Sequence, residues 1–263
     1  MNIIVCVKRV PETAEADLTI DKAGKDIMKS GLVFDLNEWD SYAIEEAIRL
    51  KEKKGGHITV ISMGGAEVNE SLRKCLAMGA DDAVRLTDPA FEGADGHATA
   101  RVLSQRIGKL PFDLILTGTQ AEDDGYGQVG GALAELLGIP HATVVNQIEA
   151  EGKKLKVHRE LEGGLEEILE IDLPALLTIQ TGINEPRYVS IMGIRKVAQK
   201  EIKVLDAKDL TLVPNETGLS GSDTRIEKIS FPATTGAAKM IEGNPEEVAL
   251  NVLNILKDKG GVA

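Results

Sequence analysis

The chain has 263 residues and a formal net charge of -12, with 43% hydrophobic and 27% charged residues. That length can bury a large core, and the acidic balance argues against nucleic-acid or anionic-membrane binding, because both depend on basic patches. Two widely separated cysteines and the absence of a long apolar stretch predict a cytoplasmic protein with no disulfide, no metal site and no membrane insertion.

The first apolar run, residues 3–7, is typical of a buried parallel strand, and it ends at Lys8, Arg9 and Pro11. Ligands of open α/β sheets bind at the carboxyl ends of the strands. Lys8 and Arg9 are therefore predicted to lie near such a site, and a pair of solvated surface cations is the alternative.

Two features precede the second strand. Apolar triplets at residues 18–20 and 32–34 flank a polar segment and predict a short hairpin-like excursion. Residues 41–51 carry apolar side chains at helical spacing, which predicts an amphipathic helix with Asn37 or Asp40 as its cap.

Strand-like and helix-like runs then alternate along the chain. The strand-like runs lie at residues 57–62, 83–86, 112–117 and 142–145, and the helical patterns between them include 67–78 and 98–107. Such alternation predicts parallel strands joined by right-handed crossovers. The predicted fold is an α/β fold with a doubly wound, mostly parallel sheet of the Rossmann-like nucleotide-binding kind.

Residues 118–131 join one of these strands to a helix through a glycine-rich turn. Glycine lets the backbone approach a ligand closely, and a helix N-terminus offers free N–H groups to a phosphate. Gly125, Gly127 and Gln128, with the amides near Val129, are therefore candidate phosphate ligands.

The same loop lacks the Gly-Lys-Ser/Thr ending of a P-loop and the dinucleotide spacing G-x-G-x-x-G. It is predicted to bind a nucleotide without hydrolysing it. Asp123 and Asp124 would repel phosphate, so we expect them to accept from ribose hydroxyls or to order the loop. A plain strand-to-helix turn is the alternative.

Beyond residue 146, apolar and charged residues alternate, which predicts an antiparallel pair around Glu151 and Gly152. The runs 167–172 and 174–179 either continue this smaller sheet or return to the main one.

The C-terminal part of the sequence has fewer long periodic segments than the part before it. Turn formers recur from residue 199 to residue 243, and Asn244-Pro245 begins a capped helix that continues to Lys257. We therefore divide the chain into a nucleotide-binding α/β domain, residues 1–200, and a C-terminal arm and helix, residues 201–263.

A second candidate site follows the segment Asn184-Glu-Pro-Arg-Tyr188. Ile191 and Met192 form an apolar group that Arg195 and Lys196 surround with positive charge, a pattern typical of a transient docking site. A buried helix edge with snorkelling cations is the alternative.

Several segments, in order, resemble the small (beta) subunit of the electron transfer flavoproteins. The most specific, residues 157–178, has a basic residue, an acidic-Gly-Gly turn, an acid and a later proline before an apolar strand. The match spans at least residues 1–205, and other similar segments are 43–51, 76–81 and 184–188.

This resemblance implies a heterodimer with a larger alpha subunit, which carries electrons from flavin dehydrogenases, such as acyl-CoA dehydrogenases, to a downstream acceptor. The redox FAD would be held mainly by the alpha subunit, and AMP by this chain. The apolar-faced helix that ends the arm suggests that residues 201–263 pack on the alpha partner, and packing back on the chain's own domain is the alternative.

The resemblance also assigns residues. The segment around Thr13 is similar to the one that reaches the partner's flavin, and Ile191 to the apolar anchor of the docking loop. The implied cofactor-binding residues are Cys6, Lys8, Thr13, Asn37, Met63, Gly118, Gln120, Asp124, Gly125, Gly127, Gln128 and Val129.

Some members of this family bifurcate electrons and hold a second FAD in place of AMP. Residues 90–99 resemble the loop of that subset, whereas residues 35–40 depart from the Asn-Pro-aromatic-Asp pattern associated with both kinds. Other hypotheses are a stand-alone adenine-nucleotide-binding regulator and a nucleotide-dependent enzyme of the same fold.

Overall fold

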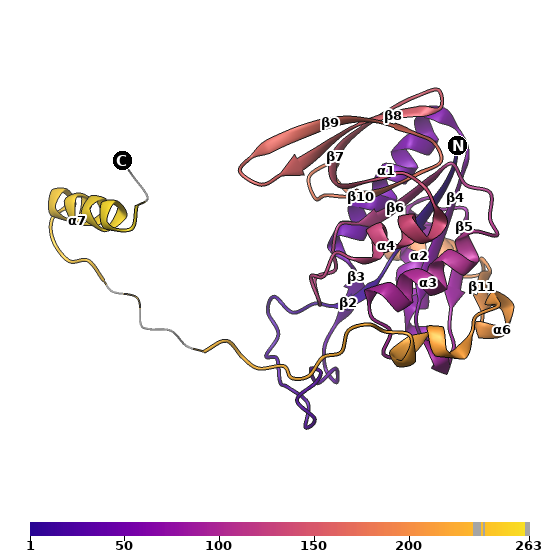
Figure 1. Cartoon of the computed structure of the whole chain (residues 1–263), viewed down its shortest axis with the longest axis horizontal. Coiled ribbons are helices and arrows are strands. Elements are labelled where there is room, and N and C mark those ends of the chain that lie inside the picture. Colours follow the sequence, from indigo (N-terminus) through magenta and orange to yellow (C-terminus); the bar gives the residue numbers. More distant parts are fainter. Residues whose placement is uncertain (234–237, 239, 261–263) are drawn as a thin grey trace. The chain divides into compact units, whose positions relative to one another are not determined.

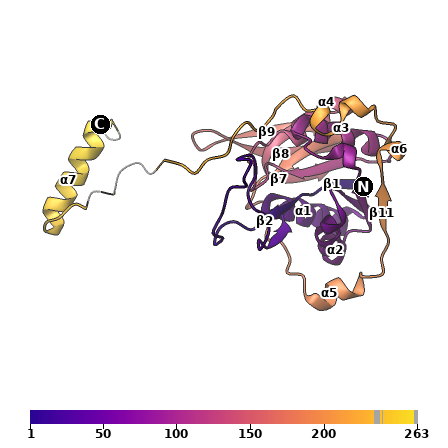
Figure 2. The same ribbon diagram turned by 90° about the horizontal axis from the view of Figure 1, so that it is seen from below.

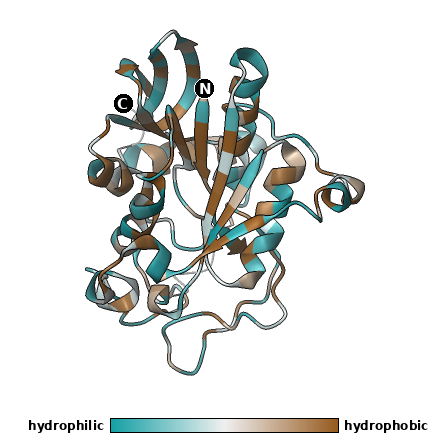
Figure 3. Cartoon of the chain, turned by 90° about the vertical axis from the view of Figure 1, so that its right-hand side faces the viewer, coloured by the Kyte–Doolittle hydropathy of each residue, from teal (hydrophilic) through white to brown (hydrophobic). Residues whose placement is uncertain are grey.

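The first strand alternates its side chains between two hydrophobic cores. Ile3 and Val5 pack in one core with residues of the first two helices, and Ile4 and Cys6 pack in the other with residues of the third and fourth helices. A strand covered on both faces must be apolar throughout, and the central strands are accordingly coloured as hydrophobic in Figure 3.

The structure, a computed structural model of the chain, describes residues 1–233, 238 and 240–260. Within them, a nine-stranded sheet has the order β11-β5-β4-β1-β6-β10-β7-β8-β9 (Figure 1). Its strands are β1 (Asn2–Cys6), β4 (His57–Met63), β5 (Asp82–Leu86), β6 (Leu114–Gly118), β7 (His141–Glu151), β8 (Lys154–Leu161), β9 (Leu165–Asp172), β10 (Ala175–Ile179) and β11 (Ile202–Leu205).

Strands β11 to β7 pair in parallel, and β8 and β9 extend the sheet in antiparallel fashion. The predicted doubly wound α/β class is confirmed. The helices are α1 (Glu38–Lys54), α2 (Asn69–Met78), α3 (Gly96–Ile107), α4 (Val129–Leu137), α5 (Ile191–Lys196), α6 (Ala207–Leu210) and α7 (Pro245–Asp258), with short 3-10 turns at Ala66–Val68, Pro89–Phe91, Pro214–Glu216 and Gly218–Ser220.

The predicted excursion forms with a different pairing. Strand β2 (Arg9–Pro11) pairs antiparallel with β3 (Phe34–Leu36), and an isolated bridge joins Ile20 to Ile27. Residues 18–20 and 32–34 therefore do not pair with each other. Arg9 is held by two contacts: its guanidinium lies 4.4 Å from the ring centre of Phe34, and its Nη2 lies 3.0 Å from a carboxylate oxygen of Glu70, in the first turn of α2, which follows the carboxyl end of β4.

The antiparallel prediction around Glu151 and Gly152 is confirmed by the β7–β8 pair. The two runs that follow take different courses. β9 continues the antiparallel part, whereas β10 returns to the main sheet and lies in parallel between β6 and β7. This return brings the end of β10 beside Gly118, at the start of the glycine-rich loop.

The chain forms two compact units, Met1–Glu227 and Lys228–Ala263. Strand β11 and helix α6, in residues that we expected to begin the arm, belong to the first unit, where β11 pairs with β5. In the second unit, Asn244 caps α7 with a capping box, as the sequence predicted. The packing of this unit on a partner stays a prediction.

A buried ion pair attaches the segment before α5 to α1. The side chain of Glu45 is 4% exposed, and it accepts hydrogen bonds from Arg187 N (3.1 Å), Nε (2.8 Å) and Nη2 (3.1 Å). Burial works to raise the pKa of Glu45, but the bonds from Arg187 prevail and hold it below its ordinary value.

Replacing Arg187 by alanine should lower the free energy of unfolding by about 2 kcal/mol, because the buried Glu45 would then keep only the bond from Arg49 (3.2 Å). The folded protein holds the pKa of Glu45 below its ordinary value of 4.5. The stability that the Glu45–Arg187 pair contributes is therefore present above pH 4.5, and it is lost as the pH falls through the lowered pKa. Urea titrations at pH 7 and pH 3 measure both effects. Arg195→Ala, at an exposed position of α5, is the control, and a deficit in Arg187→Ala that persists undiminished at pH 3 would contradict this account.

Candidate functional site

The ends of β1 and β6 are joined by one carboxylate. Asp40, near the start of α1, accepts from the backbone amide of Lys8 (2.7 Å) with one oxygen and from that of Gly118 (3.0 Å) with the other. The residue is 5% exposed. Asp40 therefore fixes where the glycine-rich loop begins relative to the first strand.

Gly118 is required by this close approach. A Cβ atom at this position would lie 2.5 Å from Oδ1 of Asp40 and 2.7 Å from Cβ of Trp39. Any other residue would push α1 away from the strand end and break the bond that Asp40 accepts.

Asn37 holds the loop itself. Its side-chain amide donates to the carbonyl of Gln120 (2.9 Å), and its Oδ1 accepts from the amide of Glu122 (3.1 Å). Although Asn37 occupies the N-cap position of α1, its side chain makes no capping bond. The predicted capping role of Asn37 or Asp40 is therefore wrong, because both side chains are committed to the strand ends and the loop.

Lys8 is neutralised by the loop. Its Nζ lies 2.6 Å from an oxygen of Asp123 and 2.9 Å from one of Asp124. Burial alone would lower the pKa of Lys8, but the hydrogen bonds that its ammonium donates to these two carboxylates outweigh burial and raise the pKa. The two acids order the loop, one of the two roles that the sequence left open, and they balance the positive charge expected at this strand end.

Two buried groups beneath the loop have strongly shifted pKa values. Burial raises the pKa of Asp40 to about 7, although the amides of Lys8 and Gly118 and the side chain of Asn37 oppose the shift. Burial, and then the charge of Asp40, raise the pKa of Cys6 to about 12. The Cys6 thiol is therefore protonated at neutral pH and forms part of the wall rather than a nucleophile.

The loop leads directly into the first turn of α4, which begins at Val129. Gly125 and Gly127 have positive φ values of 65° and 60°, which glycine adopts without strain. Within the described part of the chain no side chain caps α4, and its hydrogen-bond ladder begins with Ala132 N donating to Gln128 O (3.1 Å). The amides at residues 129–131 are therefore donors at a helix N-terminus, and this arrangement fits a phosphate.

Most of the remaining predicted cofactor residues lie near this loop. Met63 ends β4, the strand paired with β1, so it lies at the same edge of the sheet as Cys6 and Lys8. Gln120 and Asp124 belong to the loop that Asn37 and Lys8 hold. Thr13 instead lies beyond β2, where its carbonyl accepts from the amide of Ala16 (3.3 Å).

The predicted docking residues lie on a short helix away from this edge. Figure 2 shows α5 beside α2, joined to the rest of the chain by an extended segment on each side. Arg73 of α2 donates to the carbonyl of Val197, just after α5 (2.8 Å). Ile191 and Met192 are 70% and 61% exposed. Arg195 and Lys196 are exposed in the last turn of α5, so the alternative of a buried helix edge is wrong.

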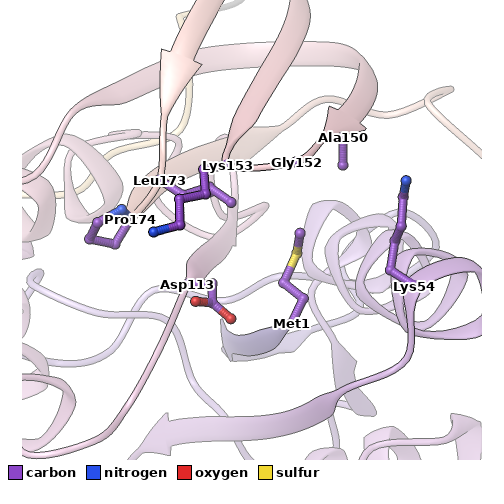
Figure 4. Close-up of a pocket in the computed structure, with 8 residues that line it drawn as sticks. All are labelled: Met1, Lys54, Asp113, Ala150, Gly152, Lys153, Leu173 and Pro174. Carbon is purple, nitrogen blue, oxygen red and sulfur yellow. The ribbon is translucent and has the colours of Figure 1, made fainter.

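A separate cavity of about 550 Å³ lies at the opposite end of the sheet (Figure 4). It contains none of the predicted site residues. It is lined by Met1, Lys54, Asp113, Ala150, Gly152, Lys153, Leu173 and Pro174.

Sequence reasoning missed the central role of Asp40. A signal for it exists, because Asp40 lies three and four residues before Ala43 and Ile44, on the buried face of α1. A carboxylate on the apolar face of an amphipathic helix must be paired. Trp39 was also missed; its indole donates to Oε1 of Gln180 (2.9 Å), just beyond β10.

The sheet order and the contacts at its carboxyl edge define a Rossmann-like α/β protein with a glycine-rich loop at that edge. Comparison with known proteins gives the family. The profile of the family described as "Electron transfer flavoprotein domain" matches residues 27–210. The chain belongs to this family.

Curated relatives match almost the whole chain. "Electron transfer flavoprotein subunit beta" of Thermoanaerobacterium thermosaccharolyticum is 45% identical over 98% of this chain and 99% of the relative. The protein of the same name from Methylophilus methylotrophus is 40% identical, with 99% and 100% covered. The "Caffeyl-CoA reductase-Etf complex subunit CarD" of Acetobacterium woodii is 40% identical, with 98% and 99% covered.

Asp40→Asn should change how stability depends on pH. In the native protein the pKa of Asp40 is about 7, above its ordinary value of 3.8. The stability that Asp40 contributes is therefore fully present below pH 3.8 and is lost as the pH rises to about 7. The stability of the native chain relative to Asp40→Asn should therefore fall between about pH 4 and pH 7 and level off above. Denaturant titrations of both proteins across this range measure the difference, and parallel curves would contradict the assignment.

Proposed function

We propose that the chain is the small subunit of a heterodimeric electron transfer flavoprotein. The heterodimer carries electrons from flavin dehydrogenases, such as acyl-CoA dehydrogenases, to a downstream acceptor. The main support is the joining of Lys8, Asn37 and Asp40 to the glycine-rich loop at one edge of the sheet, in a chain that matches beta subunits over almost its full length.

On this proposal, the chain binds AMP and the larger alpha subunit holds the redox FAD. The amides at residues 129–131 would hold the phosphate, and Asn37 would keep the loop in its binding conformation. FAD supplies the redox chemistry when it is bound, and the residues of this chain orient and bind. Asp123 and Asp124 together outweigh the charge of Lys8, so on this proposal the phosphate depends on the backbone amides of α4 rather than on a side-chain cation.

Helix α7 is proposed to pack on the alpha subunit. Its apolar residues are not buried within its own unit, and an apolar helix face suits a protein partner. They include Leu250, Val252, Leu253, Ile255 and Leu256. No helix in the described part of the chain is long and apolar enough to span a membrane, and Cys6 and Cys75 are free thiols, which supports a reducing compartment such as the cytoplasm.

The second candidate is electron bifurcation, with a second FAD in place of AMP. One observation favours it. Gly96, in the loop that resembles the bifurcating subset, packs so closely on Gln128 that a Cβ atom there would lie 3.1 Å from Cβ and Oε1 of Gln128. That loop therefore borders the same crevice, where it could contact a ligand larger than AMP.

Coexpression with an alpha subunit should give a yellow heterodimer. Acid release of its nucleotides, followed by chromatography, distinguishes the two candidates. One FAD and one AMP per heterodimer supports the simple carrier, and two FAD supports bifurcation. A colourless chain that never associates with the alpha subunit would contradict both.

Ile191→Ala should slow electron transfer from the dehydrogenase about tenfold, because truncating an apolar docking anchor costs about 1.4 kcal/mol or more. Nucleotide content should stay the same. Val204→Ala, which truncates a 47% exposed side chain on β11, is the matched control and should leave the rate unchanged. Stopped-flow reduction of the heterodimer by reduced dehydrogenase measures the rate, and equal rates for both variants would refute the docking role.

A further inference from the structure

Beyond β11 and α6, the C-terminal arm contains a segment that is bonded to the residues before α3. This arm root, residues 217–224, follows α6 and runs back toward α3, as the orange part of Figure 1 shows. Leu219 donates its amide to the carbonyl of Glu92 (2.9 Å). A Cβ atom at Gly218 would collide with the carbonyl oxygens of Ala90 and Glu92, so the approach of the two segments depends on glycine.

Asp95 is the centre of this attachment. One carboxylate oxygen caps α3 by accepting from the amide of Ala98 (2.9 Å). The other accepts three hydrogen bonds from the arm root, from the amides of Asp223 and Thr224 and from the hydroxyl of Thr224, each at 2.9 Å.

Ser222 completes the attachment from the opposite side. Its Oγ accepts from the amide of Asp95 (2.9 Å) and lies within donating distance of the carbonyl of Gly218 (2.7 Å). We call the set of Asp95, Ser222 and Thr224, with the amide of Asp223, the clasp. Burial works to raise the pKa of Asp95, but the bonds from Ala98, Thr224 and Asp223 prevail and lower it, so the clasp forms around an ionised acceptor.

The clasp and the candidate nucleotide loop meet at the first turn of α3. Gly96 directly follows Asp95, and it packs against Gln128, the residue that precedes α4. The arm root, Asp95, the first turn of α3 and Gln128 therefore form one continuous set of contacts. The clasp is also the last cluster of side-chain bonds in the first compact unit, which ends at Glu227.

We infer that Asp95 is a positioning residue that links the C-terminal arm to the nucleotide crevice, so that a bound nucleotide and a fastened arm root stabilise each other. The inference rests on the proposed function, in which this crevice binds AMP. Fastening the arm root holds α3 against Gln128, and a nucleotide on the loop holds Gln128 against α3. Such coupling must be reciprocal, because each event changes the free energy of the other by the same amount.

Asp95→Asn tests this link while keeping the cap of α3, because asparagine caps helices about as well as aspartate. Its amide nitrogen would replace the oxygen that accepts the three arm bonds. The matched control is Asp223→Asn, which removes the same charge but keeps the backbone amide that donates to Asp95. Thr224→Val removes only the hydroxyl bond and cannot disturb the cap.

The experiment uses the full heterodimer, depleted of AMP, with added AMP as the probe. Hydrogen exchange of the peptide covering residues 217–226 should be about tenfold faster in Asp95→Asn, which corresponds to about 1.4 kcal/mol. The AMP dissociation constant should rise about fivefold, with a smaller rise in Thr224→Val and none in Asp223→Asn. In the native heterodimer, AMP should slow exchange at the arm root by the same factor of about five.

An AMP dissociation constant in Asp95→Asn that stays within twofold of the native value would overturn the inference. So would arm-root exchange that does not respond to AMP. A native heterodimer that binds no AMP would instead contradict the proposed function of the crevice, and the inference with it.

Discussion

The carboxylate of Asp40 accepts hydrogen bonds from the backbone amides at the ends of two strands, which lie more than a hundred residues apart in the sequence. Burial makes this arrangement costly for a charged group, as its pKa of about 7 reflects. The two amide bonds offset part of that cost and fix the start of the glycine-rich loop. The start of the loop at Gly118 and the backbone of Lys8 are both held by this one side chain, and Asn37 holds the loop further along.

The groups around the loop differ in their chemistry. The cation at the first strand end is neutralised by Asp123 and Asp124, the Cys6 thiol stays protonated, and no cluster in the described residues could hold a metal ion. What the loop offers is a set of backbone donors at the start of α4. If the chain binds a nucleotide as proposed, these backbone donors are the groups that would hold its phosphate.

Much of the fold could be predicted from the sequence, because buried parallel strands are apolar throughout and helices show their own spacing. Strand β10 was harder, since an apolar run after a hairpin suits either sheet, and only the pairing with β6 and β7 decides. At the site, the order of strand, glycine-rich loop and helix was predicted, but the hydrogen bonds of Asn37 and Asp40 were not. A carboxylate at the start of a helix suggests an N-cap. The amides that donate to Asp40 belong to Lys8 and Gly118, and a local sequence pattern does not show that these distant segments meet.

The most direct test of the crevice is hydrogen exchange of the purified heterodimer, with and without AMP, read at the loop and the first turn of α4. If the amides of residues 127–131 hold the phosphate, AMP should slow their exchange strongly, whereas the hairpin of β8 and β9 should exchange at the same rate in both samples. AMP that binds stoichiometrically but leaves these loop amides exchanging as before would contradict the account, because the nucleotide would then bind elsewhere.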